Sequence, residues 1–111
     1  MFGKLFAPGS KVMEVDVTEA SRRQDAGAVL VDVPEPEEWR AGHAQGARHI
    51  PLGELSRRAG ELPKEREILL ICRGGNRSRT AAQLLAWAGY ERVVNVHGGM
   101  MAWMRPSLPL G

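Results

Sequence analysis

Ile68-Leu69-Leu70-Ile71-Cys72-Arg73-Gly74-Gly75-Asn76-Arg77-Ser78 is the stretch that decides the fold of this chain. The four apolar residues at its start predict a strand that is covered on both faces. The only cysteine of the chain follows at the carboxyl end of that strand, and two adjacent glycines predict a tight loop. Farther on, apolar residues recur at helical spacing until Gly89, which predicts a helix that begins near Arg77.

This layout predicts an anion site around a reactive thiol. A loop that closes onto a helix N-terminus points several backbone N–H groups at one spot, and the helix dipole adds a partial positive charge there. Gly74 and Gly75 let these N–H groups form an anion-binding nest, and Arg73 and Arg77 add full charges. We expect the Cys72 thiol to ionise readily in this setting and to act as a nucleophile. A lone cysteine after an apolar run is more often a small buried hydrophobe, but the combination of features favours the catalytic interpretation.

The rest of the chain alternates between strand and helix patterns. The expected strands cover residues 11–17, 28–33, 48–50, 68–71 and 91–96. The expected helices cover residues 18–27, 34–41, 52–62, 77–88 and 98–105. Thr18, with Ser21 and Asp16 nearby, offers an N-cap for the first of them. Such alternation implies right-handed crossovers and an α/β fold, with a mainly parallel central sheet of about five strands and helices on both faces. Ligands bind beyond the carboxyl ends of such strands, where Asp32, Cys72 and residues 97–99 are expected.

Composition narrows the class of protein. The 111 residues are 43% apolar and 25% charged, with a net charge of +2 and interleaved signs, which gives little support to a nucleic-acid surface. The longest apolar run is far below the roughly 20 residues that a membrane span needs, and residues 1–7 are too short for a signal peptide. One cysteine excludes an intrachain disulfide and suits a reducing cytoplasm. We expect a cytoplasmic domain at residues 11–106 with a leader at 1–10, a tail at 107–111, and no membrane or nucleic-acid partner.

The heptapeptide of residues 72–78 resembles the active-site loop of the rhodanese (sulfurtransferase) family, which reads Cys-x-x-Gly-x-Arg followed by Ser or Thr. Other short segments of the chain also resemble the family's sequence pattern: residues 31–33, 35–39, 42–43, 46–47, 50–51, 98–99 and 102–103. The resemblance therefore extends over nearly the whole chain, and it implies the three-layer rhodanese-like fold and a thiosulfate sulfurtransferase with a single domain.

The resemblance also implies roles for the loop. Cys72 would attack the outer sulfur of a small anionic donor such as thiosulfate, expel sulfite and carry a persulfide. An external acceptor would then take the sulfur: cyanide in assays, or a thiol or a dithiol protein in cells. The implied substrate-binding residues are Arg73, Gly74, Gly75, Asn76, Arg77 and Ser78. Backbone amides would hold the persulfide and the arginines would attract the anion or hold the loop, whereas Ser78 is interpreted as a helix cap. No cofactor and no metal are expected.

Several residues outside the loop have structural interpretations. His43 and His97 are expected to make structural hydrogen bonds, and Asp32 to cap its strand or brace the loop. The family usually has arginine where this chain has Pro34, so an ion pair with a nearby glutamate is missing and the turn is stiffened. Three tryptophans are expected in the core or at its edge: Trp39, Trp87 and Trp103.

Two alternative functions remain open. Cysteine phosphatases and arsenate reductases that resemble rhodanese place five residues between the cysteine and the arginine, whereas this chain has the four residues 73–76. The smaller ring suits a sulfur atom better than a phosphoryl group, and Ile71 stands where phosphatases usually carry histidine. The second alternative is a sulfur-carrier or regulatory module that acts with a partner protein. Modules without catalysis usually lack the cysteine, which this chain keeps.

Overall fold

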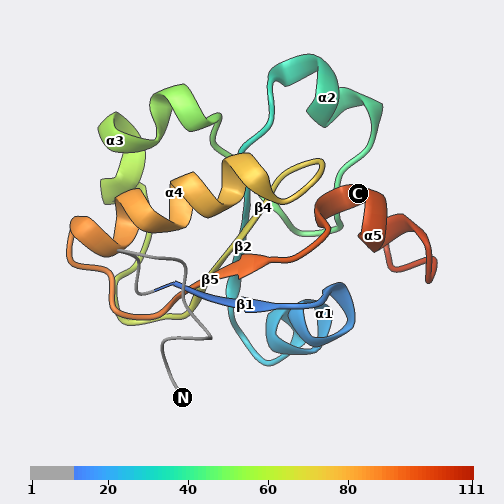
Figure 1. Ribbon diagram of the computed structural model, residues 1–111, viewed down its shortest axis with the longest axis horizontal. Helices are drawn as coiled ribbons and strands as arrows, with labels where there is room; N and C mark the ends of the chain where they lie inside the picture. Colours follow the sequence, from blue (N-terminus) through green and yellow to red (C-terminus); the bar gives the residue numbers. More distant parts are fainter. Residues whose placement is uncertain (1–11) are drawn as a thin grey trace.

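The computed structural model describes residues 12–111 (Figure 1). The expected leader at residues 1–10 lies outside the described residues. The elements follow one another as β1 (Met13–Val15), α1 (Val17–Asp25), β2 (Val29–Asp32), α2 (Pro36–Ala41), β3 (Arg48–His49), α3 (Leu55–Arg58), β4 (Ile68–Ile71), α4 (Asn76–Trp87), β5 (Val93–Val96) and α5 (Gly99–Met104). None of the helices in this part of the chain is long and apolar enough to cross a membrane.

A parallel sheet forms the centre of the described residues. Its five strands lie in the order β1-β5-β4-β2-β3, and every neighbouring pair is parallel. The predicted α/β fold with a mainly parallel sheet is therefore confirmed. Asp32 at the end of β2 lies opposite Ile71 at the end of β4, so the loops that follow these two strands leave the sheet at the same edge.

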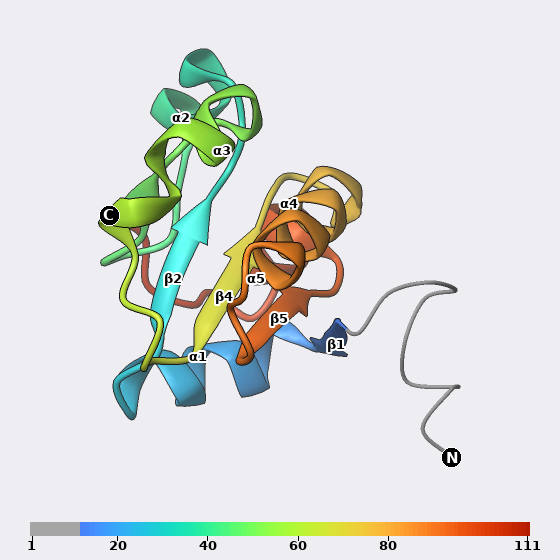
Figure 2. The same cartoon turned by 90° about the vertical axis from the view of Figure 1, so that its left-hand side faces the viewer.

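Side chains alternate between the two faces of the sheet and divide the core in two. Ile68, Leu70 and Cys72 pack in the half that α3 and α4 cover. Leu69 and Ile71 pack in the other half with residues of α1 and α5. Figures 1 and 2 show α4 and α1 on opposite sides of the strands. This three-layer arrangement fixes which helix closes over the thiol, because Cys72 follows Leu70 at a spacing of two residues.

Two helices differ from the sequence prediction in detail. Of the residues considered for the N-cap of α1, which were Thr18, Ser21 and Asp16, it is Asp16 that caps the helix, and its side chain accepts the Glu19 N–H at 2.9 Å. The helix predicted over residues 52–62 is a short α-helix between two 3-10 turns, η2 (Leu52–Glu54) and η3 (Ala59–Glu61). Each of these turns contains a glycine, Gly53 or Gly60, and glycine costs about 1 kcal/mol in a helix interior.

The tryptophans do not share one role. Trp103 is buried in the core as predicted, and its indole N–H donates to the Pro109 carbonyl at 3.0 Å, which ties the C-terminal residues to α5. The prediction of core packing is wrong for Trp87, which is 72% exposed. The buried face of α4 includes Leu85, and a residue two positions later points about 200° around the helix, away from that face.

Candidate functional site

The Cys72 sulfur sits inside the loop between β4 and α4. Gly75 is the N-cap of α4 with φ of 102°, a left-handed conformation that favours glycine. This conformation turns the Gly75 N–H toward Sγ of Cys72 at 3.1 Å, and the Ser78 N–H donates to the same sulfur at 3.3 Å. Cys72 is only 1% exposed. The thiol is thus enclosed, but backbone donors face it, as the sequence predicts for an anion-binding loop.

Ser78 has a different position from the one predicted. It lies in the first turn of α4, completely buried, and it does not cap the helix because Gly75 does. Its Oγ lies 3.3 Å from Sγ of Cys72 and 2.6 Å from Oδ1 of Asn95. The hydroxyl carries one proton, so at any moment it donates to one of these two acceptors. A negative charge on the sulfur would draw that proton toward Sγ.

Asn95 is the site residue that the sequence analysis missed. It is completely buried in β5, and its Nδ2 donates to the Gly75 carbonyl at 3.2 Å and to a Glu14 carboxylate oxygen at 3.1 Å. Asn95 thereby holds both the N-cap of α4 and the Ser78 hydroxyl. The signal in the sequence is a polar residue inside the apolar strand of residues 93–96.

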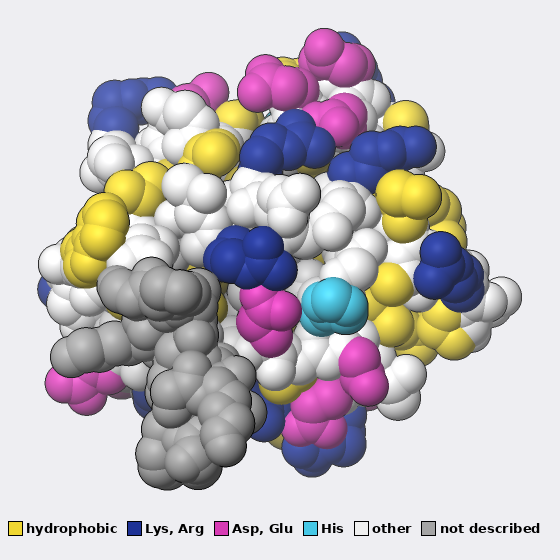
Figure 3. All heavy atoms as spheres, viewed as in Figure 1, with side chains coloured by type: hydrophobic (Ala, Val, Ile, Leu, Met, Phe, Trp, Pro, Cys, Tyr) yellow, Lys and Arg dark blue, Asp and Glu magenta, His cyan; other side chains and the backbone are white. Residues whose placement is uncertain are grey.

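The two arginines of the loop act differently. Arg77 donates two hydrogen bonds to the Glu38 carboxylate, at 2.6 and 2.9 Å, and so joins α4 to α2. These bonds lower the pKa of Glu38 to about 2. Figure 3 shows acidic side chains gathered over α2 with basic side chains beside them. Arg73 is exposed, as are Gly74 and Asn76. The Arg73 side chain is therefore open to solvent, whereas the Arg77 guanidinium is held by Glu38.

The start of α5 clamps the loop from the other side of the sheet. The Met100 N–H donates to the Cys72 carbonyl at 2.7 Å, and the Met101 N–H donates to the Arg73 carbonyl at 3.2 Å. Gly99 has φ of 58°, and a Cβ on it would overlap the Cys72 carbonyl oxygen. Only glycine allows this approach without strain, which explains one of the two glycines after His97.

Asp32 is buried beside this loop. It is 0% exposed, and neither carboxylate oxygen has a hydrogen-bond partner within residues 12–111, so the expected brace to the loop is not formed. Burial, assisted by the negative charge of Glu38, raises the pKa of Asp32 to about 7. Asp32 is one of the residues that line a hollow of about 30 Å³, together with Pro34, Arg73 and others.

The histidines do not surround the sulfur. His43 stacks on Trp39 with ring centroids 3.5 Å apart, and its Nδ1 hydrogen-bonds the Trp39 carbonyl at 2.9 Å, as predicted for a structural role. His49 stacks on the same tryptophan at 4.7 Å. His97 is exposed, and its Nδ1 lies 3.5 Å from a Glu14 carboxylate oxygen. Across residues 12–111, no group of three or more His, Cys, Asp or Glu side chains is placed to hold a metal ion.

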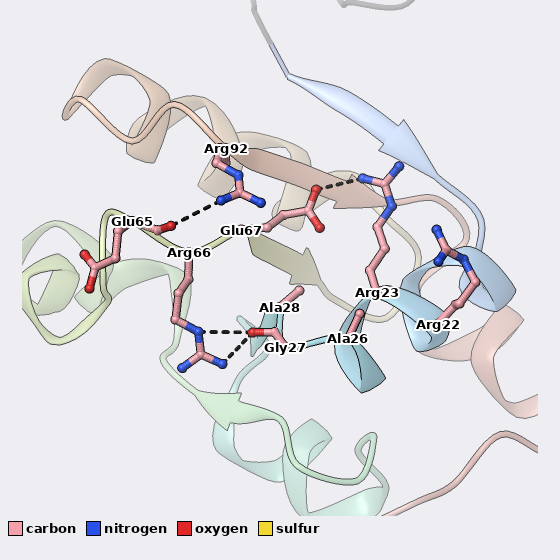
Figure 4. Close-up of a pocket in the computed structure, with 9 residues that line it drawn as sticks. All are labelled: Arg22, Arg23, Ala26, Gly27, Ala28, Glu65, Arg66, Glu67 and Arg92. Atoms are coloured by element: carbon pink, nitrogen blue, oxygen red, sulfur yellow. Dashed lines mark hydrogen bonds and ion pairs between the residues drawn. The ribbon is translucent and has the colours of Figure 1, made fainter.

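A wider hollow of about 530 Å³ lies at the opposite edge of the sheet, before β2 and β4 begin (Figure 4). Arg66 and Arg92 there donate to backbone carbonyls, and Arg23 pairs with Glu67 at 2.7 Å. The remaining arginine, Arg22, pairs with a carboxylate of its own helix. These guanidinium groups already have acceptors, so the sulfur loop is the better candidate site.

A comparison with models of protein families shows which family the chain belongs to. The model of the rhodanese-like domain family matches residues 16–106. The chain belongs to this family. The resemblance seen in the sequence is thus confirmed for the rhodanese-like domain. A solved structure of a rhodanese-related protein from Thermoplasma volcanium has a TM-score of 0.81 and 28% identity, and the match covers 88% of this chain and 96% of that one.

Relatives of this rhodanese-like domain are named for sulfur handling. A protein named sulfurtransferase from Allochromatium vinosum is 37% identical over 101 residues, which are 89% of this chain and 94% of that protein. YrkF of Bacillus subtilis, whose name describes it as a candidate sulfur carrier protein, is 38% identical over 96 residues, which are 85% of this chain. This chain spans 52% of the length of YrkF. The names associate the family with sulfur transfer.

Proposed function

We propose that this rhodanese-like domain is a sulfurtransferase that moves a sulfane sulfur through a persulfide on Cys72. The donor is thiosulfate or a similar small anion, and the acceptor is an external thiol, a dithiol protein or, in vitro, cyanide. The observation that carries the proposal is the convergence of donors on one sulfur. The Gly75 and Ser78 N–H groups and the Ser78 hydroxyl all lie within 3.3 Å of Sγ.

The first half of the reaction loads the sulfur. The Cys72 thiolate attacks the outer sulfur of thiosulfate, the S–S bond of thiosulfate breaks, and sulfite leaves with the electron pair. The persulfide carries a negative charge, which the fixed donors of the loop stabilise in a water-poor setting. Exposed Arg73 attracts the anionic donor, and Arg77 keeps the loop in place through its two bonds to Glu38.

The second half of the reaction releases the sulfur. A nucleophile attacks the outer sulfur of the persulfide, the bond to Sγ breaks, and Cys72 leaves as a thiolate. The chain has no second cysteine, so this nucleophile comes from another molecule. The loop donors that stabilised the persulfide now stabilise the leaving thiolate, so the same geometry serves both halves.

A sulfur-carrier module is the second candidate, because YrkF carries that description in its name. The two functions differ in turnover. A sulfurtransferase regenerates free Cys72 with small acceptors such as cyanide, whereas a dedicated carrier gives up its sulfur only to a partner protein.

Mass spectrometry of the protein after incubation with thiosulfate tests the proposal. We expect a gain of one sulfur atom on the peptide that contains Cys72, and loss of that sulfur on addition of cyanide. Cys72→Ser should gain no sulfur and form no thiocyanate while keeping the circular dichroism spectrum of the wild-type protein. Retained transfer by folded Cys72→Ser would refute the persulfide route.

A further inference from the structure

The orientation of the Asn95 side chain is fixed by its partners. Its Nδ2 donates one hydrogen bond to the Gly75 carbonyl at 3.2 Å and another to a Glu14 carboxylate oxygen at 3.1 Å. A carbonyl and a carboxylate only accept, so the NH2 end of the amide has to face them. Burial opposes ionisation of Glu14, but hydrogen bonds from Arg79 and Asn95 keep its pKa below the ordinary value. The amide oxygen of Asn95 is therefore left for Ser78.

Asn95 points to the same face of the sheet as the sulfur. In the sheet register it lies beside Leu70 of β4 on one side and beside Glu14 of β1 on the other. Leu70 and Cys72 both pack in the half of the core that α4 covers. The contact of 2.6 Å between Asn95 Oδ1 and the Ser78 hydroxyl of α4 agrees with this placement. The amide thus lies between the edge strand and the sulfur loop.

The contact between Ser78 and Asn95 determines where the hydroxyl proton lies at rest. The amide oxygen has no proton, so the Ser78 hydroxyl donates to it at 2.6 Å. Oγ then presents a lone pair to Sγ of Cys72 at 3.3 Å, and this lone pair accepts the S–H proton of an uncharged thiol. All hydrogen bonds of this chain run in one direction, from the thiol to the Glu14 carboxylate, and bonds arranged in this way strengthen one another.

A negative charge on the sulfur reverses the first part of this chain. When the thiol proton leaves to solvent, or when the persulfide forms, Sγ becomes an acceptor, and the Ser78 hydroxyl rotates to donate to it. The rotation breaks the bond to Asn95. We propose that Asn95 is a positioning residue of Cys72, which keeps the Ser78 proton away from the sulfur until the sulfur is charged. The proposal rests on the sulfurtransferase function and deepens it.

The second acceptor lets one hydroxyl serve both states of the sulfur. An uncharged thiol needs an acceptor and a thiolate needs a donor, and a hydroxyl can be either. If Asn95 were apolar, Sγ would be the remaining acceptor of the Ser78 hydroxyl among the contacts of the described residues. The hydroxyl would then donate to the sulfur permanently, and a thiolate that is stabilised more strongly is a weaker nucleophile. Asn95 therefore limits how strongly the loop stabilises the thiolate before it attacks.

The test has to separate this hydroxyl from the charges around the thiol. Arg77 of α4 is bound to Glu38 of α2, and Arg79 of α4 is bound to Glu14 of β1. These carboxylates are the main reason why the pKa of each arginine is raised, and the charge of Cys72 adds to the effect. The sequence of α5 has no titratable side chain. Substitutions at positions 78 and 95 leave these charges in place, together with the remaining ones at the ends of β2 and β5 and in the loop: Asp32, His97 and Arg73.

A pH titration of the ultraviolet absorbance of the thiolate tests the proposal, because Cys72 is the only cysteine of the chain. Cys72→Ser supplies the blank. In Asn95→Leu the Ser78 hydroxyl donates to Sγ without competition, so we expect the midpoint of the absorbance to fall by about one pH unit. In a Ser78→Ala background the same substitution should leave the midpoint in place, because the hydroxyl through which Asn95 acts is gone.

A role of Asn95 in packing alone predicts a different result. Loss of support for the loop would shift the midpoint equally with and without the Ser78 hydroxyl, and equal shifts would overturn the proposal. An unchanged or raised midpoint in Asn95→Leu would overturn it as well. The titration needs no sulfur transfer, so failure of the wild-type protein to load sulfur from thiosulfate would refute the proposed function and not the role of Asn95.

Glu14→Gln replaces Asn95→Leu if that variant does not fold, as judged by circular dichroism. It removes the charge at the end of the chain, which weakens the hold of Asn95 on the Ser78 proton. The loss of a nearby negative charge lowers the midpoint in any background. We therefore expect a larger fall with Ser78 present than in the Ser78→Ala background, and equal falls would contradict the proposal.

Discussion

Ser78→Ala is the sharpest probe of the sulfur loop, because it removes a single donor that points to Sγ. The hydroxyl is completely buried, 3.3 Å from Sγ and 2.6 Å from Oδ1 of Asn95. The backbone N–H of residue 78 remains in place, so the loop keeps its two amide donors. The substitution therefore separates the contribution of the hydroxyl from that of the loop conformation.

The expected loss follows from the two acceptors of the hydroxyl. A hydrogen bond to a charged group contributes about 1.5–3 kcal/mol. In the resting protein the shorter contact of the hydroxyl is to Asn95. Turning its proton toward the sulfur breaks that hydrogen bond, so we expect a net contribution to loading near the lower end of this energy range. About 1.4 kcal/mol corresponds to a tenfold slower loading of Cys72. Asn95 Oδ1 loses a partner, which should reduce the free energy of unfolding by about 1–2 kcal/mol.

Single-turnover loading with thiosulfate, followed by mass spectrometry, measures the rate, and urea unfolding measures stability. Thr80→Ala is the matched control, since Thr80 is an exposed residue of the same helix that loses the same kind of hydroxyl. It should load at the wild-type rate. Unchanged loading by Ser78→Ala, or an equal loss in both variants, would refute the role assigned to the buried hydroxyl.

Two further predictions concern the supports of the loop. Gly99→Ala places a Cβ against the Cys72 carbonyl oxygen at a positive φ. We therefore expect the free energy of unfolding, measured in urea, to fall by about 3 kcal/mol or more. Gly53→Ala is the control, because Gly53 has open space around it, and its stability should stay near that of the wild type. Glu38 has a pKa of about 2 in the folded protein against 4.5 as the ordinary value, so its ion pair with Arg77 stabilises the fold above about pH 4.5 and is lost as the pH falls toward 2. Both side chains are partly exposed, so solvent screening limits this contribution to about 1 kcal/mol; acid titration of the melting temperature should show it in wild type and not in Glu38→Gln.

The central part of the fold could be predicted from the sequence, because the residue patterns that indicate it lie close together along the chain. An apolar strand, two glycines and a helical repeat lie within one continuous stretch, so β4, the loop and the start of α4 follow from residues 68–78. The first turn of α4 begins at Asn76, one residue earlier than predicted. The end of that helix was also predicted, but the direction of Trp87 was not, since it depends on the helical phase relative to Leu85.

The rest of the candidate site depends on contacts between distant residues. Nothing near Ser78 in the sequence indicates that its hydroxyl meets Asn95, which is 17 residues away on β5. The same holds for Arg77 and Glu38, 39 residues apart, whose pairing makes Arg77 a structural support. The unpartnered state of Asp32 is a property of the packed core, so the sequence could indicate only its place at the end of a strand.

The enclosure of Cys72, with 1% of its surface exposed, insulates the thiol from other folded macromolecules. A disulfide brings two sulfur atoms to about 2 Å, and a second copy of this chain cannot bring its own enclosed sulfur that close while both copies stay folded. Two folded copies therefore cannot form a disulfide between their Cys72 residues. Only small oxidants that enter the loop can oxidise the Cys72 thiol. A protein that collects the sulfur has to present its thiol on a slender, protruding segment, because a flat surface would stop at the rim.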